Sequence, residues 1–311
     1  PRTKEEEESI NIYPSRAPGN PINKLWTGWD RKLLAVDVDS GKIAWQLSSR
    51  ILPGTLALDE QSAYFHNAER IVAIDKKTGA ERWISEPVAA IDIERGIPTG
   101  YTPKLVVENG VVVCAGGRGY KQHMRGETLK MVALDANDGK ILWESPHYTS
   151  GYQSPEDLLV VDNTVLSPFS TWLKDKDPKN NHVVGTDLST GELVYDSQPD
   201  VEDPVWFIHH RCYPSKATSK YLLMSKEGVE FIDHETRHWQ IHHWIRGACL
   251  YGIMPANGLL YAPMHDCACS ANMKLNGFNA VAGREMRVPS KLDVTKYQLT
   301  KGPAFAKIDA S

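Results

Sequence analysis

Short apolar segments alternate with polar, turn-forming segments along most of the chain. Typical apolar segments are Ile71-Val-Ala-Ile74, Leu158-Leu-Val-Val161 and Tyr221-Leu-Leu-Met224, each next to turn-forming or polar residues. Segments of this length between turn signals are typical of β-strands, whereas helices need longer segments with a period of 3.6 residues. The pattern predicts an all-β protein made of many short antiparallel strands.

One motif recurs within these segments. It consists of Ala-x-Asp, a turn that ends in Gly, and an aromatic residue, and its copies contain Asp37, Gly41 and Trp45; Asp75, Gly79 and Trp83; and Asp135, Gly139 and Trp143. A weaker fourth copy begins with Gly185 in place of Ala and contains Asp187, Gly191 and Tyr195. A fifth copy, Phe231-Ile-Asp233 with Glu235-Thr236, lacks the Gly. Each copy predicts a β-hairpin, because Asp can accept bonds from nearby backbone N–H groups and Gly supplies a positive φ. The spacing fits the ~40–45-residue period of four-stranded propeller blades with inserted loops.

The motif resembles the tryptophan-docking motif of the pyrroloquinoline-quinone (PQQ)-like propellers, which include quinoprotein alcohol dehydrogenases and an outer-membrane assembly lipoprotein. The resemblance covers roughly residues 30–283. It implies that Trp45, Trp83 and Trp143 pack between blades. It also implies an all-β fold, a β-propeller of four-stranded antiparallel blades, of which about six are visible here, whereas such propellers usually close with seven or eight.

The repeat also predicts a domain layout. Residues 1–23 are expected to be disordered or a linker, residues 24–283 to form the propeller, and residues 289–311 to be a linker or the start of a following segment. A partial first blade should extend to about residue 50, and further blades should occupy about residues 54–87, 103–146, 155–197, 207–244 and 250–288.

Composition excludes some classes of partner. The 311 residues carry a formal net charge of −4, without the basic surface that nucleic-acid binding requires. No stretch approaches the ~18 consecutive apolar residues of a membrane-spanning helix. We therefore expect neither a nucleic-acid partner nor a membrane span.

The loops predict which end of the propeller is functional. In a four-stranded blade, the loops between the second and third strands and the connections between blades emerge at one end, which we call the long-loop end. Here these loops are long, whereas the turns at the opposite end are short, as at Glu108-Asn-Gly110 and Asp162-Asn163. Long loops on a rigid scaffold commonly carry function, so we expect a ligand or partner at the long-loop end.

Histidine, arginine and cysteine residues gather in three segments that the topology places at this end. They comprise His209, His210, Arg211 and Cys212; Arg246 and Cys249; and His265, Cys267 and Cys269. Cys and His are ligands for transition metals, although Cys-x-Cys lacks the spacing of common zinc sites. Three interpretations stay open for the cysteines: disulfides such as Cys249 with Cys267 or Cys212 with Cys269, a metal or redox site, and free buried thiols.

A longer stretch from Arg246 through Pro263 to Ala280 resembles a segment of a bacterial subfamily of PQQ-binding-like β-propeller repeat proteins. That resemblance brings no known reaction. Propellers of this kind are usually exported, which implies a periplasmic or extracellular location in a bacterium.

Two functions follow as hypotheses. The first is a binding propeller for a small molecule, carbohydrate or protein, with aromatic side chains on the loops for stacking on sugars: Tyr101, Tyr120, Tyr148, Tyr152, Trp172 and Trp206. The second is an enzyme that uses His209, His210, Arg211, Arg246 and His265, either a quinoprotein-type oxidoreductase or a metal-dependent carbohydrate-active enzyme.

The acidic residues do not support PQQ as a cofactor. Dehydrogenation with PQQ needs an Asp base, Ca²⁺ held by carboxylate and amide oxygens, and cations for the quinone carboxylates. The acidic candidates at the long-loop end are Glu156, Asp157 and Asp266, which we expect to be solvated surface residues. The cofactor is therefore left unknown, with a transition metal as one option.

Overall fold

A computed structural model of the chain describes residues 24–26, 30–88, 97–98, 103–116, 129–147, 156–168, 183–200, 213–225, 228–242, 244–248, 251–264 and 275–283. These residues form strands and turns. None of them belongs to a helix that is long and apolar enough to span a membrane.

The described strands assemble into successive antiparallel sheets, which we call blades. Blade one is β2 (Arg31–Val36) and β3 (Ile43–Ser49); blade two is β4 (Ala57–Leu58), β5 (Ser62–His66), β6 (Arg70–Asp75) and β7 (Glu81–Pro87); blade three is β9 (Lys104–Glu108), β10 (Val111–Ala115), β11 (Leu129–Asp135) and β12 (Ile141–His147). Blade four is β13 (Leu159–Val161), β14 (Thr164–Pro168), β15 (Val183–Asp187) and β16 (Leu193–Ser197); blade five is β17 (Lys216–Ala217), β18 (Tyr221–Met224), β19 (Val229–Asp233) and β20 (Trp239–His242); blade six is β21 (Met254–Ala256), β22 (Leu259–Ala262) and β23 (Asn279–Ala282).

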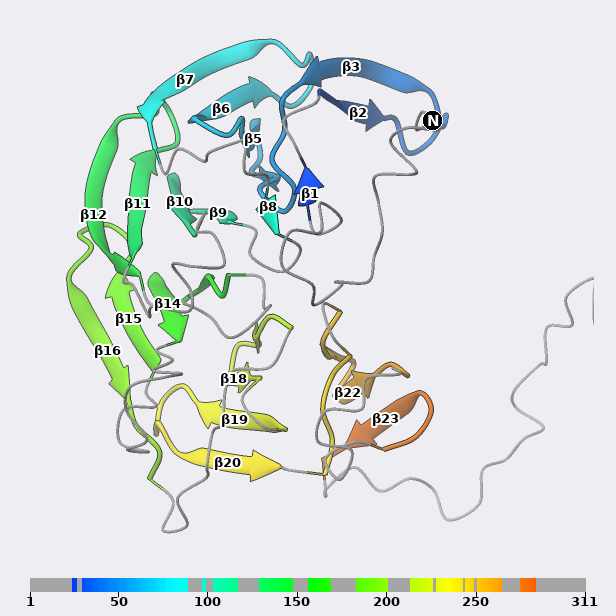
Figure 1. Ribbon diagram of the computed structural model, residues 1–311, viewed down its shortest axis with the longest axis vertical. Helices are drawn as coiled ribbons and strands as arrows, with labels where there is room; N and C mark the ends of the chain where they lie inside the picture. Colours follow the sequence, from blue (N-terminus) through cyan, green and yellow to red (C-terminus); the bar gives the residue numbers. More distant parts are fainter. Residues whose placement is uncertain are drawn as a thin grey trace, which may run out of the picture.

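The blades follow one another around an arc, with β3, β7, β12, β16 and β20 on the outside (Figure 1). The first strands of neighbouring blades lie side by side on the inside, β4 next to β9, β9 next to β13, and β13 next to β17. This arrangement confirms the all-β propeller fold. One small sheet was not expected: β1 (Lys24–Trp26) pairs with β8 (Ile97–Pro98).

The repeated Asp residues form the turns as the motif predicts. In blade two, Asp75 Oδ1 accepts bonds from the backbone N–H of Lys77 at 3.0 Å and of Thr78 at 2.8 Å. Gly79 then donates its N–H to the carbonyl of Asp75 at 2.8 Å, with a φ of 73° that disfavours any other residue. The Thr78 hydroxyl also donates to Asp75 Oδ1 at 2.9 Å, and this bond contributes most to lowering the pKa of Asp75, followed by the bond from the Thr78 backbone N–H.

The aromatic residue of each copy docks on the turn of the next blade. The indole N–H groups donate to turn carbonyls at 2.9 Å in every case: Trp45 to Lys76, Trp83 to Ala136, and Trp143 to Leu188. The rings lie against the turn glycines, because a Cβ on Gly79, Gly139 or Gly191 would come within 2.8, 2.5 and 2.7 Å of the docked ring. The Gly is therefore needed both for its backbone conformation and for the space that it leaves.

A shift in strand register orients each docking aromatic residue toward the turn of the next blade. Ala35 pairs with Trp45, Ala73 with Trp83, Ala133 with Trp143 and Gly185 with Tyr195, and in each hairpin the register shifts immediately after this pair. An extra residue of this kind bends and twists a strand locally. The repeated irregularity thus belongs to the docking geometry.

Blade four docks on blade five by a different contact. Tyr195 replaces the Trp, and Arg237 occupies the place of the missing Gly with a φ of 61°. The Arg237 guanidinium lies 5.0 Å from the centre of the Tyr195 ring and donates to the carbonyl of Asp196 at 3.1 Å. Tyr195 has a smaller ring than Trp and leaves room for the Arg237 side chain on the turn. The replacement of Trp by Tyr therefore compensates for the replacement of Gly by Arg.

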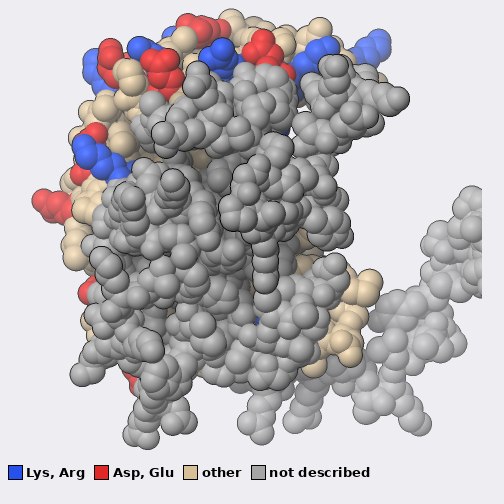
Figure 2. Space-filling model, in the orientation of Figure 1, with Lys and Arg blue, Asp and Glu red and all other residues tan. Residues whose placement is uncertain are grey.

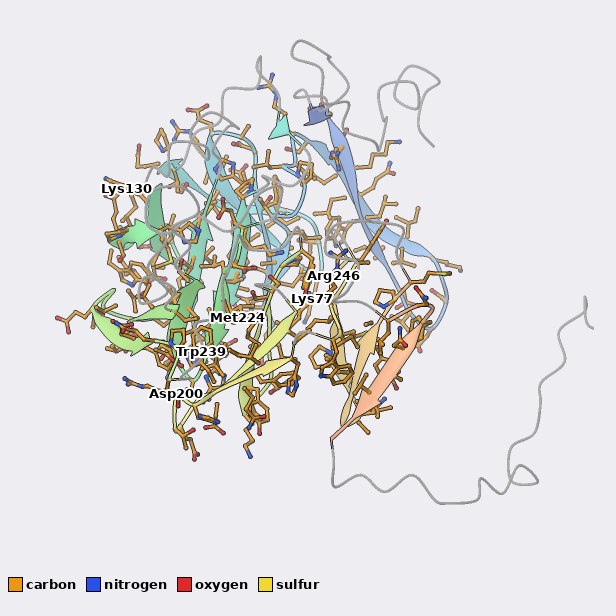
Figure 3. The ribbon with its side chains drawn as sticks, turned by 60° about the horizontal axis from the view of Figure 1, so that its bottom comes forward. Lys77, Lys130, Asp200, Met224, Trp239 and Arg246 are labelled. Atoms are coloured by element: carbon orange, nitrogen blue, oxygen red, sulfur yellow. The ribbon has the colours of Figure 1, made fainter. Side chains whose placement is uncertain are left out.

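Trp239 reinforces this interface from blade five. Its indole N–H donates to the Ser197 hydroxyl and its backbone N–H to Asp200 Oδ1, both at 2.9 Å, and Figure 3 shows Trp239 and Asp200 close together. The side chain is almost fully buried. This role of Trp239 was not recognised in the sequence because Trp239 does not occupy the aromatic position of the repeated motif.

The hydrophobic core lies between the blades rather than in one central cluster. Separate clusters join each pair of neighbouring blades, as where Tyr64 and Trp83 of blade two pack with Val112 of blade three. The outer strands instead expose every second residue, and Figure 2 shows charged side chains of both signs interspersed along the outer rim. Each blade is therefore stabilised mainly by its neighbours.

A matched pair of glycine substitutions isolates the docking contact. Gly41 and Gly139 both have a positive φ, but a Cβ at Gly41 meets nothing within 4 Å. Gly41→Ala should cost about 1 kcal/mol through the backbone alone. Gly139→Ala should cost a further ~1–3 kcal/mol, because its methyl group overpacks the Trp83 ring. Thermal denaturation of both variants measures the difference, and equal losses would contradict the docking contact.

The Tyr195–Arg237 exchange is testable by a double-mutant cycle. Tyr195→Trp alone should lower the unfolding free energy by about 1–3 kcal/mol, because the larger ring meets the Arg237 side chain. In the Arg237→Gly background the same substitution should be neutral or stabilising, since the pair then matches the other blades. Urea denaturation gives the coupling free energy, and strictly additive effects would show that the two side chains act independently.

Candidate functional site

A pocket of about 310 Å³ lies at the long-loop end of the inner strands. Three neighbouring blades line it where β9, β13 and β17 begin. We call it the inner-strand pocket; its lining is Lys104, Glu156, Asp157, Leu158, Leu159, Val160, Pro214, Ser215, Lys216 and Ala217. Because it is formed where three blades meet, its shape depends on how the blades are docked.

One carboxylate of this pocket is held from the neighbouring blade. Asp157 Oδ1 accepts a bond from the backbone N–H of Ser215 at 2.8 Å, and Oδ2 accepts one from the Ser215 hydroxyl at 2.7 Å. The side chain is 1% exposed. Asp157 therefore joins the beginnings of blades four and five, and its position is fixed without a ligand.

The second carboxylate belongs to a buried chain of polar groups. Glu156 Oε2 lies 3.0 Å from His147 Nε2, and His147 Nδ1 lies 3.0 Å from the Ser167 hydroxyl. Behind Glu156, a Cβ on Gly116 would come within 2.4 Å of the Glu156 side chain. These hydrogen-bonded side chains join the end of blade three to blade four.

A serine, a histidine and an acid in contact also form the catalytic triad of many hydrolases. In that mechanism the hydroxyl must reach a substrate and the base must face it. Here Ser167 is 2% exposed, and both His147 and Glu156 are completely buried. The arrangement therefore serves blade packing.

The expectation that Glu156 and Asp157 are solvated surface residues is wrong. Both carboxylates are buried and hydrogen-bonded by residues from other strands, His147 and Ser215. Sequence reasoning missed this because both contacts join different blades: His147 ends blade three, and Ser215 lies before blade five, far along the chain from Asp157. A Glu-Asp pair immediately before an inner strand is the signal that could have identified them.

Two lysines lie at the first positions of their strands in the same pocket. Lys104 begins β9 and Lys216 begins β17, and both side chains are half-buried. Burial lowers the pKa of Lys104, and the positive charge of Lys216 lowers it further, while the negative charge of Asp157 acts in the opposite direction. Burial is thus the main cause of the lowered pKa of Lys104, and the attraction of Asp157 exceeds the repulsion by Lys216.

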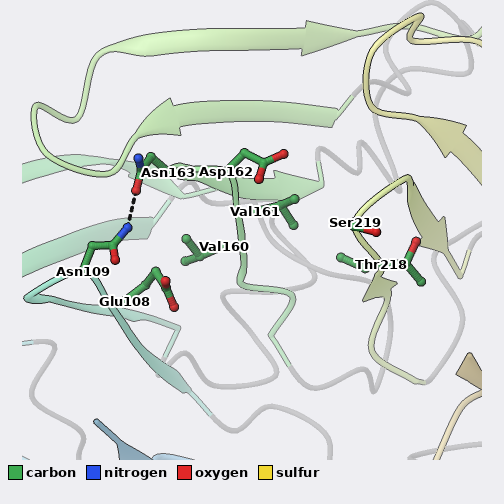
Figure 4. Close-up of a pocket in the computed structure, with 9 residues that line it drawn as sticks. Glu108, Asn109, Val160, Val161, Asp162, Asn163, Thr218 and Ser219 are labelled. Carbon is green, nitrogen blue, oxygen red and sulfur yellow. Dashed lines mark hydrogen bonds between the residues drawn. The ribbon is translucent and has the colours of Figure 1, made fainter. Parts of the chain in front are cut away.

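The opposite end, where the docking turns lie, has a groove along its inner rim. A pocket of about 520 Å³ is lined by the short inner turns of blades three to five, including Glu108, Asn109 and Asp162 (Figure 4). Asn109 Nδ2 donates to Asn163 Oδ1 across it at 2.6 Å. A further pocket of about 470 Å³ between blades two and three shares Glu108 and Asn109.

These rim pockets follow from the turn geometry. Asn109, Asp162 and Asn163 have φ values of 45°, 48° and 58°, as two-residue hairpin turns of this kind require. The turn conformations explain why these positions hold Asn and Asp. Both rim pockets lie between the inner turns of neighbouring blades. We therefore assign the candidate site to the inner-strand pocket.

Most of the residues predicted as catalytic or metal-binding lie outside the described residues. These are His209, His210, Arg211, Cys212, Cys249, His265, Cys267 and Cys269, and the six loop aromatics and Asp266 lie outside them too. Their roles remain predictions.

Arg246 is the one residue predicted as catalytic that lies among the described residues. It lies in the connection to blade six, is 2% exposed, and is labelled in Figure 3. Nearby, a Cβ on Gly252 would come 3.0 Å from the Tyr213 ring and 3.5 Å from the carbonyl oxygen of Pro214. The connections that lead into blades five and six therefore lie against each other beside the inner-strand pocket.

Of the five cysteines, Cys114 is the one that lies among the described residues. Within the described ranges, no group of three or more His, Cys, Asp or Glu residues is placed to hold a metal ion. Cys114 lies in β10 as a free, fully buried thiol, and burial raises its pKa to about 12. Such a thiol is unreactive and serves as a small apolar side chain.

The comparisons with known proteins agree on the architecture. A family model described as outer membrane protein assembly factor BamB matches residues 29–210. No curated protein matches the sequence. The solved structures below share 16% identity or less with this chain, at TM-scores under 0.5, and the fold rests on the blades described above.

Similar solved structures include BamB from Moraxella catarrhalis, with 16% identity and a TM-score of 0.46 over 71% of this chain and 58% of that chain. A quinohemoprotein alcohol dehydrogenase from Comamonas testosteroni has 16% identity and a TM-score of 0.49 over 75% of this chain and 48% of that chain. A europium-containing methanol dehydrogenase has 14% identity and a TM-score of 0.44 over 82% of this chain and 63% of that chain. The chain thus spans about half to two thirds of their lengths.

The buried His147–Glu156 pair should matter far more for stability than an exposed pair of the same type. His147→Phe keeps the ring shape but removes a partner from a buried carboxylate, so we expect a loss of about 3 kcal/mol. The matched control is His238→Phe, which breaks the half-exposed His238–Asp200 contact of 2.7 Å and should cost less than about 1 kcal/mol. Urea denaturation compares them; similar losses would mean that the buried chain does not join the blades.

Proposed function

Because the chain belongs to the family described as outer membrane protein assembly factor BamB, we propose that it is a propeller that binds a ligand or partner at its long-loop end. The inner-strand pocket is the centre of this binding surface. The proposal involves binding without a chemical step. A periplasmic or extracellular location in a bacterium belongs to the same proposal.

The observation that carries the proposal is the difference between the two ends. At the docking-turn end, the turn carbonyls and glycines are occupied by Trp45, Trp83 and Trp143. At the long-loop end, two lysines and two buried carboxylates from three blades line one pocket that is large enough for part of a small molecule, whereas the larger rim pocket is lined by turn residues. A rigid scaffold with such a pocket is suited to recognition.

Exposed aromatic and thioether side chains lie around the same end. Tyr251 is 81% exposed in the connection to blade six, and Met264 is 73% exposed after β22. Tyr and Met are enriched in protein interfaces, where they supply contact area with few polar groups to desolvate. Tyr251 immediately precedes Gly252, whose position next to Pro214 brings it beside the inner-strand pocket.

The described residues do not fit the cofactor that the PQQ-like propellers suggest. Dehydrogenation with PQQ needs a carboxylate base and carboxylate ligands for a calcium ion, and both must face the pocket. Asp157 directs both carboxylate oxygens at Ser215, and Glu156 lies against His147. Oxidoreductase chemistry through PQQ is therefore not part of the proposal.

Site-specific photo-cross-linking tests the proposed function. Tyr251 is replaced by p-benzoylphenylalanine in the full-length protein, which is then irradiated in the cells that produce it. Val38, 95% exposed in the docking turn of blade one, is replaced in the same way as a control. We expect adducts from Tyr251 and none from Val38, detected by intact mass for small ligands and by gel shift for proteins.

Adducts from Val38 alone would place binding at the docking-turn end. A lack of adducts at both positions would also contradict the proposal, provided that both variants are folded and irradiation consumes the benzophenone. Either result would leave the fold assignment intact, because the fold rests on the blades and their docking.

A further inference from the structure

The acidic and the basic side chains of the inner-strand pocket differ in their hydrogen bonding. The pocket carboxylates are directed at protein donors: Asp157 at Ser215, and Glu156 at His147. No hydrogen bond or ion pair joins the ammonium group of Lys104 or Lys216 to any residue that the structure describes. The pocket thus offers donors and positive charge, and its acceptors are occupied.

Position and burial make these lysines different from surface lysines. Each occupies the first residue of an innermost strand, and the strands belong to blades three and five on either side of Asp157. Strand pairing fixes the main chain at both lysines: Lys104 lies opposite Ala115, and Lys216 lies opposite Leu223. The charges are therefore held in one pocket by the sheets and do not depend on a mobile loop.

We propose that the inner-strand pocket binds an oxyanion, a carboxylate or a phosphate group, between the ammonium groups of Lys104 and Lys216. This inference rests on the proposed function, because it names the chemistry that the long-loop end recognises. Burial disfavours an ammonium group that has no counter-ion, so a shared anion would stabilise the charge on two half-buried lysines in one pocket. A volume of about 310 Å³ admits the anionic group with a few further atoms.

The neighbouring negative charge does not satisfy the site by itself. Asp157 attracts the Lys104 ammonium group more strongly than Lys216 repels it, yet burial still leaves the pKa of Lys104 below its ordinary value. Glu156 also lines the pocket but is engaged by His147. Lysine binds oxyanions as a point charge, without the bidentate geometry of arginine, so the site should accept carboxylate and phosphate alike.

Isothermal titration calorimetry on the full chain tests the assignment, with succinate and inorganic phosphate as probes at low ionic strength. We expect one anion per chain. Lys104→Met and Lys216→Met, which keep the apolar stem and remove the charge, should each weaken binding about tenfold, the loss of one charge-assisted hydrogen bond. The control is Lys77→Met, since Lys77 is exposed on the docking turn of blade two and is labelled in Figure 3.

Proton uptake provides a readout that a merely structural lysine would not give. A bound anion favours the charged form of Lys104 and moves its lowered pKa back upward, so binding takes up protons where Lys104 is partly neutral. The measured heat should then depend on the ionisation enthalpy of the buffer. This dependence should be smaller in Lys104→Met.

The outcomes separate the two proposals. Absence of binding by both probes, or equal weakening in Lys77→Met, would overturn the oxyanion site. If adducts still form at Tyr251 in that case, the long-loop end binds something else and the proposed function stands. Tighter binding of succinate than of phosphate, or the reverse, would support the site and identify which oxyanion it prefers.

Discussion

The contact between one blade's tryptophan and the next blade's turn determines the rest of the structure. It combines three requirements: an indole N–H bonded to a turn carbonyl at 2.9 Å, a turn held by an Asp side chain, and a Gly that leaves space for the ring. Each hairpin alone is too small to bury its apolar residues. Docking places successive sheets face to face, and the clusters between blades then form the core.

This constraint makes the two ends of the propeller unequal. The residues of the docking turns contact the tryptophan of the preceding blade, so packing between blades determines which residues stand there. The inner-strand pocket lies at the other end, and its polar groups are fixed by bonds that cross from blade to blade, as between Asp157 and Ser215. A displacement between blades three and five would move Lys104 relative to Lys216, so the geometry of the site depends on docking at the opposite end.

Local, repeated features were predictable from the sequence, and contacts between remote residues were not. The Asp-to-Trp motif predicted hairpins and docking residues because each copy carries its turn chemistry within a few residues. The compensation between Tyr195 and Arg237 was not predicted, since it joins two separate copies. The burial of Asp157 was missed for the same reason, and that of Glu156 because its partner His147, although near in the chain, belongs to the preceding blade. Lys104 and Lys216 carry no motif, and only the juxtaposition of β9 and β17 around one pocket reveals them.

Hydrogen–deuterium exchange of the full chain, with and without saturating succinate, tests most directly whether the long-loop end binds while the docking-turn end holds the blades. The account predicts that succinate slows exchange in residues 156–158 and 213–217, which border the inner-strand pocket, and leaves the docking turns at Asp75 and Asp135 unchanged. Slower exchange confined to the docking turns, or no change at either end, would contradict it.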